Sequence, residues 1–325
     1  SYGPMLHPPF PVFSAASILP YLSQKSKSSR PTFLTGREFP GIIGKTILFA
    51  ERVSFMELVH FQPLPGSDGH VTGYLHTPIT EMAVRRERFP TVVLCPGGAY
   101  IGCSLREADP VALRFFARGY QVFTLIYSTG EKAKDFQPLK ELSETFRLIR
   151  EKAADYWVDP ERMAVCGFSA GGHLAASLGT LWNDEEFLRH YDNHGGQNRP
   201  DAMVLCYPVI TADEHAHVMS LCNVSGCQPG TPGYEYFSLD KHVSQDTCPA
   251  FLWHTMEDDC VPVENSLKML AALHNAGVPA EAHFFPHGGH GMSVCTQETG
   301  SPDAYNARWM DLCLDWLDNT FGYQL

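Results

Sequence analysis

The sequence predicts an α/β fold in which a mostly parallel β-sheet carries helices on both faces. Short apolar runs rich in Val, Leu and Cys alternate with amphipathic stretches along most of the chain. Strands are expected at Thr91–Cys95, Gln121–Tyr127, Arg162–Cys166, Ala202–Tyr207, Ala250–His254 and Ala280–Phe285. Helices are expected at Asp109–Arg118, Leu139–Ala154, Gly171–Leu181, Glu264–Ala276 and Tyr305–Phe321. Because the strand runs contain few polar positions, both of their faces are expected to be buried between helix layers.

The segment before this alternation predicts an antiparallel hairpin. Val53–Gln62 and His70–His76 flank the turn-forming residues Pro65–Gly69. Two later connections, Asn183–Pro200 and Thr211–Thr247, are longer than most connections in compact domains. Connections of that length are usually functional or disordered. The second follows an expected strand directly, on the side of the sheet where α/β proteins bind ligands.

Residues 1–50 differ from the rest of the chain. They contain seven prolines and a patch rich in Ser and Lys, Ser23–Arg30. Such a segment is expected to form either an arm over the body of the protein or a contact with a second subunit of a homo-oligomer. Residues 51–325 contain no internal repeat and no strong boundary, so they predict one α/β domain.

The composition narrows the classes of partner. The 325 residues are 44% hydrophobic and carry a net charge of −12, with 24 Lys and Arg against 36 Asp and Glu. A nucleic-acid partner is not expected, because binding to a phosphate backbone depends on basic side chains that release counterions. No apolar run approaches the length of about 18 residues that a membrane-spanning helix needs, so no membrane partner is expected either.

The ten cysteines do not form the pattern of a disulfide framework. Cys95, Cys166 and Cys206 lie in strand-like runs, where a thiol packs as a small hydrophobic group. No CxxC pair and no Cys/His group with zinc spacing occurs, so no metal is expected and a reducing compartment is favoured. Met5–Tyr21 contains four prolines and lacks the basic start of a signal peptide. We therefore expect a cytoplasmic protein, with a secreted protein as the alternative.

The segment Gly167–Gly171, GFSAG, carries the strongest chemical signal. It follows an expected strand and opens an expected helix. In that context a GxSxG motif holds its serine in a strained turn and presents the hydroxyl at the carboxyl edge of the sheet. The flanking glycines let neighbouring elements pack closely. Because a serine hydroxyl becomes a good nucleophile only when a base takes its proton, Ser169 predicts a partner base elsewhere in the chain.

That base is expected last in the chain order Ser, Asp or Glu, His. His290 lies just after the strand expected at Ala280–Phe285 and before the last helix, where this arrangement places its base. His287 is the alternative.

The acid is expected after the preceding strand, which ends at His254. Glu257, Asp258 and Asp259 are adjacent there, and Asp258 is preferred, followed by Asp259 and then Glu257. The acid would hold the imidazole in one tautomer and stabilise the imidazolium without taking its proton.

The anionic intermediate of such chemistry needs hydrogen-bond donors. The loop Cys95–Tyr100, CPGGAY, follows an expected strand, and its paired glycines allow backbone N–H groups to turn toward a substrate. We expect the oxyanion donors to be Gly97 and Gly98 together with Ala170, the residue after the serine. Tyr100 and Tyr207 are the candidate substrate contacts.

These segments resemble the α/β-hydrolase esterases. More narrowly, they are similar to the bacterial acetyl esterases grouped with acetyl xylan esterases, which are neighbours of the prolyl oligopeptidase-like hydrolases. The similarity extends over roughly residues 90–325 and is carried by CPGGAY, DPERMAVCGFSAGGHLAASLG, FLWHTMEDDCVPVENSL and FFPHGGHG. It implies the roles given above to Ser169, Asp258 and His290. It also favours Asp258 over Asp259, because the family spacing from a histidine to the acid and on to Val-Pro runs from His254.

The resemblance implies a serine esterase that hydrolyses short acyl groups, acetyl first, from a carbohydrate or similar alcohol through an acyl-enzyme. Such a reaction requires no cofactor and no metal, and its partner is a small acylated substrate such as an acetylated oligosaccharide. One alternative is a peptidase or amidase of the prolyl oligopeptidase-like branch, but 50 residues are too few for the propeller that usually precedes that domain. The other is a non-catalytic binding protein, which typically loses a member of the triad.

Overall fold

The computed structural model describes residues 56–79 and 87–323. The predicted extension, residues 1–50, therefore lies outside the described residues. The strands are β1 (Met56–Phe61), β2 (His70–His76), β3 (Phe89–Cys95), β4 (Gln121–Ile126), β5 (Val158–Phe168), β6 (Ala202–Cys206), β7 (Ala250–Thr255) and β8 (Ala280–Phe285). The helices are α1 (Asp109–Ala117), α2 (Gln137–Glu151), α3 (Ala170–Leu181), α4 (Glu185–Leu188), α5 (Val218–Ser225), α6 (Pro232–Glu235), α7 (Glu264–Ala276) and α8 (Arg308–Phe321). Three 3₁₀ turns complete the set: η1 (Leu105–Glu107), η2 (Gly130–Ala133) and η3 (Leu239–Lys241).

The eight strands form one sheet in the order β1-β2-β4-β3-β5-β6-β7-β8. The pairs β1–β2 and β2–β4 are antiparallel, and every other pair is parallel. The predicted hairpin is present, with Met56 opposite His76 and Phe61 opposite Val71. The predicted fold class, an α/β-hydrolase fold with a mostly parallel sheet, is therefore confirmed.

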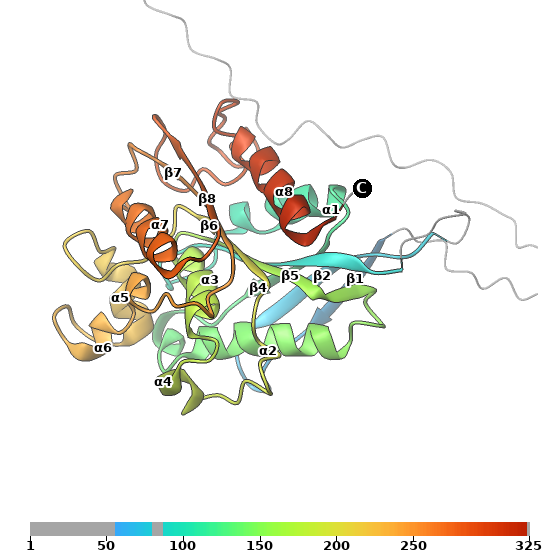
Figure 1. Cartoon of the computed structure of the whole chain (residues 1–325), viewed down its shortest axis with the longest axis horizontal. Coiled ribbons are helices and arrows are strands. Elements are labelled where there is room, and N and C mark those ends of the chain that lie inside the picture. Colours follow the sequence, from blue (N-terminus) through green and yellow to red (C-terminus); the bar gives the residue numbers. More distant parts are fainter. Residues whose placement is uncertain (1–55, 80–86, 324–325) are drawn as a thin grey trace, which may run out of the picture. The chain divides into compact units, whose positions relative to one another are not determined.

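Helices cover both faces of this sheet, as Figure 1 shows. In β3, Val93 and Cys95 point to one buried cluster, while Val92 and Leu94 point to the other, because successive side chains of a strand face opposite ways. Helices α2, α3 and α7 contribute to the first cluster, and α1 and α8 to the second. Two hydrophobic cores hold the sheet, which explains why its strands are apolar throughout.

The two long connections are built from short helices and turns. Asp184 begins α4 by accepting hydrogen bonds from the N–H groups of Glu186 and Phe187. The second connection contains α5, α6 and η3, and α5 ends at Gly226 in the left-handed conformation (φ 68°) that favours glycine. From the sequence, these stretches could be predicted only to be unusually long. Helices of four to eight residues are too short for their apolar periodicity to be recognised.

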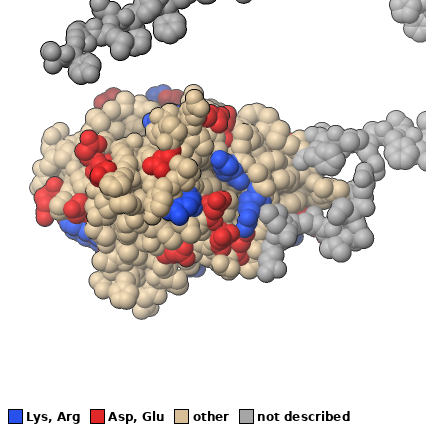
Figure 2. Space-filling model, turned by 90° about the horizontal axis from the view of Figure 1, so that it is seen from above, with Lys and Arg blue, Asp and Glu red and all other residues tan. Residues whose placement is uncertain are grey.

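The described surface mixes charges of both signs. On the face drawn in Figure 2, Lys and Arg side chains lie among Asp and Glu. Arg147, for example, pairs with Glu144 and Glu151 on α2. Within residues 56–79 and 87–323, none of the helices combines the length and the apolar character required to cross a bilayer. All ten cysteines are free thiols.

Candidate active site

Ser169 occupies the turn between β5 and α3 in a strained conformation, with φ 53° and ψ −118°. The residues two positions before and after it, Gly167 and Gly171, must be glycines for steric reasons. A Cβ on Gly167 would overlap the carbonyl group of Gly171, and a Cβ on Gly171 would overlap the carbonyl group of Cys95. The strand, the turn and the helix can therefore approach closely enough to present the serine hydroxyl at the carboxyl edge of the sheet.

The structure brings Ser169, His290 and Asp258 together. The Nε2 atom of His290 lies 2.8 Å from Ser169 Oγ, and its Nδ1 atom lies 2.7 Å from Asp258 Oδ2. An ionised carboxylate only accepts hydrogen bonds, so the imidazole proton belongs on Nδ1. Nε2 is then the acceptor for the serine hydroxyl, which is the tautomer that a general base at this position requires.

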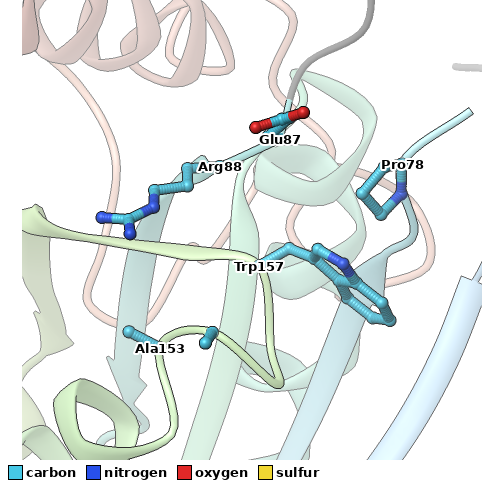
Figure 3. A pocket seen from close by; sticks show the side chains of 6 residues that line it. Pro78, Glu87, Arg88, Ala153 and Trp157 are labelled. Atoms are coloured by element: carbon cyan, nitrogen blue, oxygen red, sulfur yellow. The ribbon is translucent and has the colours of Figure 1, made fainter.

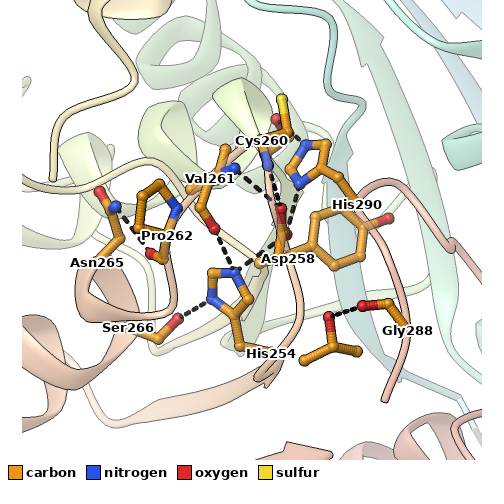
Figure 4. A network of polar contacts seen from close by, with 12 residues as sticks. His254, Asp258, Cys260, Val261, Pro262, Asn265, Ser266, Gly288 and His290 are labelled. Atoms are coloured by element: carbon orange, nitrogen blue, oxygen red, sulfur yellow. Dashed lines mark hydrogen bonds and ion pairs between the residues drawn. The ribbon is translucent and has the colours of Figure 1, made fainter. Parts of the chain in front are cut away.

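Asp258 is held as an ionised acceptor. Figure 4 shows its Oδ1 atom receiving the backbone N–H groups of Cys260 at 3.0 Å and Val261 at 2.9 Å. Its Oδ2 atom accepts hydrogen bonds from His254 Nε2 at 3.2 Å and from His290 Nδ1. Burial opposes ionisation, but these hydrogen bonds and the charge of His290 outweigh it and hold the pKa of Asp258 well below its usual range.

His254, at the end of β7, orients the acid from behind. Its Nε2–H is shared between Asp258 and the Val261 carbonyl group at 3.0 Å. Its Nδ1 atom then accepts the Ser266 hydroxyl at 2.8 Å. At the level of sequence His254 served only as a spacing marker. The available signal was a histidine within a buried strand, four residues ahead of the acid.

The alternative acids and base do not join this arrangement. His287 is exposed, and its Nδ1 atom lies 2.9 Å from Glu257 Oε1 in a surface pair. Asp259 is also exposed. The structure thus places Asp258 and His290, and none of their rivals, beside Ser169.

Of the three predicted oxyanion donors, the structure directs one elsewhere. The N–H of Gly97 donates to Glu107 Oε2 at 2.7 Å, inside the protein. The loop then turns at Gly98 (φ 137°), where a Cβ would overlap the Gly102 carbonyl group. Among the described residues, none accepts a hydrogen bond from the N–H of Gly98 or of Ala170, the first residue of α3. The position of Gly97 corrects its assignment as a donor, and Gly98 and Ala170 stay as the candidates.

The two tyrosines predicted to contact substrate lie beneath the site. Tyr100 and Tyr207 are 0% and 1% exposed. The Tyr100 hydroxyl bonds to His173 Nδ1 at 2.9 Å, and the Tyr207 hydroxyl donates to Glu107 Oε1 at 2.7 Å. Each side chain is covered, and its hydroxyl is hydrogen-bonded inside the protein. The structure therefore corrects their assignment as substrate contacts: Tyr100 supports His173, and Tyr207 supports Glu107.

A separate hollow lies at the opposite edge of the sheet. Its volume is about 400 Å³, and Figure 3 shows Pro78, Arg88, Ala153 and Trp157 around it. Arg88 precedes β3 and Trp157 precedes β5, so the hollow opens at the amino ends of these parallel strands. Ser169 follows the carboxyl end of β5. The hollow is therefore no part of the site at Ser169.

Comparison with known proteins identifies the family. Residues 79–273 match the BD-FAE family. The chain belongs to the BD-FAE family. The predicted resemblance to α/β-hydrolase esterases is thereby confirmed.

Relatives of this BD-FAE chain include esterases. The acetylxylan esterase of Xylanibacter ruminicola is 30% identical over 212 residues, and endo-1,4-beta-xylanase B of Butyrivibrio fibrisolvens is 36% identical over 211 residues. These alignments cover 63% and 64% of this chain but only 41% and 33% of the respective relatives. A solved structure, an acetyl ester-xyloside bifunctional hydrolase from Caldicellulosiruptor lactoaceticus, has 34% identity and a TM-score of 0.68 over 81% of this chain and 92% of its own. The relatives confirm the predicted class, carboxylic ester hydrolases, for the family.

His173, one turn after Ser169 in α3, links three parts of the BD-FAE chain. Its Nε2–H donates to the Phe237 carbonyl group at 3.0 Å, so its Nδ1 atom accepts the Tyr100 hydroxyl from the CPGGAY loop. The side chain is fully buried, and burial lowers the pKa of His173 from 6.5 to about 4. The hydrogen bond between His173 and Tyr100 could not be predicted from sequence, because the two residues lie 73 positions apart.

This burial predicts acid sensitivity. Between pH 6.5 and about 4, the unfolded chain protonates His173 while the folded chain keeps it neutral, so the free energy of unfolding falls as pH falls through that window. Between pH 7 and pH 5 the contribution of this one residue is about 2 kcal/mol. Urea unfolding at the two pH values should therefore show a smaller loss for His173→Gln than for the wild type. His274→Gln, at an exposed position, is the control and should match the wild type. Equal losses in all three proteins would contradict this assignment.

Proposed function

We propose that this chain hydrolyses short-chain acyl esters, acetyl esters first, carried by a carbohydrate, through an acyl-enzyme formed on Ser169. One observation carries the proposal: a continuous series of hydrogen bonds from Ser169 Oγ through the His290 ring to Asp258, at 2.8 and 2.7 Å. A nucleophile, a base and an acid in that order are what acyl transfer requires.

The geometry supports the following sequence of steps. His290 Nε2 takes the Ser169 proton as Oγ attacks the acyl carbon, and the imidazolium is stabilised by ionised Asp258. The same nitrogen then gives its proton to the leaving alcohol, which leaves the acyl group on Ser169. Water then attacks the acyl carbon while His290 takes a proton from it. The bond to Ser169 Oγ breaks, the acid is released, and His290 returns the proton to Oγ, which restores the serine.

The negative oxygen of each tetrahedral intermediate would lie between the N–H groups of Gly98 and Ala170. Ala170 begins α3, where the N–H groups of the first turn have no partner within the helix and the helix dipole favours negative charge. Each donor of this kind lowers the barrier by about 3 kcal/mol.

The connection that contains α5 is suited to contact the substrate. At one end of α5, Asn223 donates to the Ala99 carbonyl group of the CPGGAY loop at 2.8 Å. At the other end, His217 Nε2 lies 3.8 Å from Cys260 Sγ, beside the acid. Since this helix reaches from the oxyanion loop to the acid turn, we propose that it forms one wall of the substrate site.

We infer the acyl group and the alcohol of the substrate from the names of related proteins. One related protein is an acetylxylan esterase, and another is an acetyl ester-xyloside bifunctional hydrolase. Both names combine an acetyl ester with a xylose-based compound, so an acetylated xylo-oligosaccharide is the substrate we propose to test first.

Matched substitutions test the triad. We expect Ser169→Ala to lower kcat for an acyl ester by about 10⁴-fold or more, because the nucleophile is lost. Asp258→Asn should lower kcat by about 10⁴-fold, because the imidazole tautomer is no longer enforced. The neighbouring substitutions Asp259→Asn and His287→Gln should change it by no more than about twofold, since both side chains lie on the surface. If Asp259→Asn were as damaging as Asp258→Asn, or if Ser169→Ala kept the wild-type rate, the proposed mechanism would be wrong.

A substrate series tests the acyl preference. For p-nitrophenyl esters of two to eight acyl carbons, kcat/KM should be highest for acetate and fall by roughly tenfold or more along the series. Acetylated xylo-oligosaccharides should release acetate with wild-type protein and none above background with Ser169→Ala. A maximum at long acyl chains, or esters of p-nitrophenol cleaved without any acetate released from the oligosaccharides, would refute the substrate while leaving the triad intact.

A further inference from the structure

A second buried carboxylate, that of Glu107, lies directly behind the candidate active site. Glu107 ends η1 and is 3% exposed. Among the described residues, no Lys, Arg or His side chain forms an ion pair with it. A charge buried without a counter-ion is costly, so hydrogen bonds must stabilise this carboxylate.

One oxygen of Glu107 holds the oxyanion loop. Oε2 accepts the N–H of Gly97 at 2.7 Å. A Cβ placed on Gly97 would lie 2.8 Å from this oxygen and 3.0 Å from Ser169 Cβ. The backbone of Gly97 is therefore enclosed between Glu107 and the nucleophile, and the position of the carboxylate determines where the next N–H, that of Gly98, can point.

The other oxygen reaches the loop that carries the base. Oε1 accepts the Tyr207 hydroxyl at 2.7 Å, and that hydroxyl in turn accepts the N–H of Ser293 at 2.9 Å. The Tyr207 ring stands edge-on to the His290 ring, with 5.1 Å between their centroids. Glu107 and Tyr207 thus connect the oxyanion loop to Ser293, in the loop of the base, and to the ring of the base itself.

The charge of Glu107 also acts on the base. Burial is the largest influence and raises the pKa of Glu107 above its usual value. The hydrogen bonds from Tyr207 and Gly97 and the charges of His290 and Arg106 offset part of that rise. Both carboxylate oxygens accept a hydrogen bond from a donor that has its own proton, which is the pattern of the ionised form.

The titratable groups that face Glu107 come from several elements: Arg106 from η1, Cys103 from the segment between the oxyanion loop and η1, Tyr127 from the end of β4, Tyr207 from the end of β6, and His290. The Arg106 guanidinium donates to the Thr299 carbonyl group. Of the other four groups, His290 is the one whose charge changes during the proposed reaction.

We propose that Glu107 is a positioning residue for the hydrolysis proposed above. Its carboxylate holds the oxyanion loop through Gly97 and the loop of the base through Tyr207. Its negative charge favours the imidazolium that forms when Ser169 attacks. This inference rests on the proposed function, and it assigns the buried glutamate a part in the reaction without any contact with the substrate.

Two substitutions separate the charge from the bonds. Glu107→Gln keeps the length of the side chain and removes the charge, whereas Glu107→Asp keeps the charge and shortens the reach. With Glu107→Gln, kcat for p-nitrophenyl acetate should fall about tenfold at nearly constant KM. The acid-side midpoint of its pH–kcat/KM profile should move to lower pH by about half a unit or more, because a neighbouring negative charge no longer favours the protonated imidazole. With Glu107→Asp, kcat should fall while the midpoint stays at the wild-type value.

A matched pair elsewhere in the fold serves as the control. Asp318 in α8 accepts the Tyr120 hydroxyl at 2.7 Å, and Tyr120 lies at the amino end of β4, away from Ser169. Asp318→Asn should lower the melting temperature and leave kcat per folded molecule and the midpoint unchanged. The folded fraction of every variant is measured by circular dichroism.

The outcomes are distinct. If wild-type protein cleaves the ester no faster than Ser169→Ala, the proposed function fails. If the wild type is active and both Glu107 variants keep its kcat and midpoint per folded molecule, only the role of Glu107 is overturned. If Glu107→Gln lowers kcat but leaves the midpoint of the pH–kcat/KM profile at the wild-type value, the proposed effect of the Glu107 charge on His290 is overturned. Should Glu107→Gln not fold, Glu107→Asp decides alone: an unchanged kcat overturns the proposal, and a reduced kcat at constant KM and midpoint supports it.

Discussion

The arrangement of the site depends on one steric constraint, the close approach of backbone segments around Ser169. A strained serine costs about 1–3 kcal/mol, and the surrounding structure must offset that cost. Its N–H donates to the Cys206 carbonyl group at 3.0 Å, and its own carbonyl group accepts the N–H of Val209 at 3.1 Å. The end of β6 thus secures the turn between β5 and α3. The turn itself can form only because Gly167 and Gly171 have no side chains: a Cβ on Gly167 would overlap the Gly171 carbonyl group, and a Cβ on Gly171 would overlap the Cys95 carbonyl group at the end of β3.

Buried charges act on the base that this packing places beside Ser169. Two buried carboxylates lie near the base and are held in different ways. Asp258 touches the imidazole directly and is surrounded by N–H donors, so it remains ionised at 8% exposure. Glu107 reaches the imidazole only through the ring of Tyr207 and the field of its charge. Because both charges lie out of water, each acts more strongly on the base than an exposed carboxylate at the same distance would.

The fold and the three central side chains could be predicted from sequence because their signals are local. Apolar strands alternate with helices, and Ser169 lies in a five-residue motif whose context identifies it. Residues that act through partners far away in the sequence could not be predicted, because no local pattern identifies those partners. Glu107 bonds to Tyr207 across 100 residues, and nothing near either residue indicates the other. Gly97 was assigned as an oxyanion donor from its loop, but whether its N–H points outward depends on that same glutamate.

This division between local and distant information follows the organisation of the fold. Parallel strands all end at one edge of the sheet, so the residues that follow β5, β7 and β8 converge there whatever the connections contain. The connection between β6 and β7 is under no such constraint, since it only has to return the chain to the sheet. Helix α5 lies in this connection and reaches both Ala99 and the side chain beside Asp258. With α5 as the proposed wall of the substrate site, substrate preference could change through this helix while the hydrogen bonds among Ser169, His290 and Asp258 stay the same.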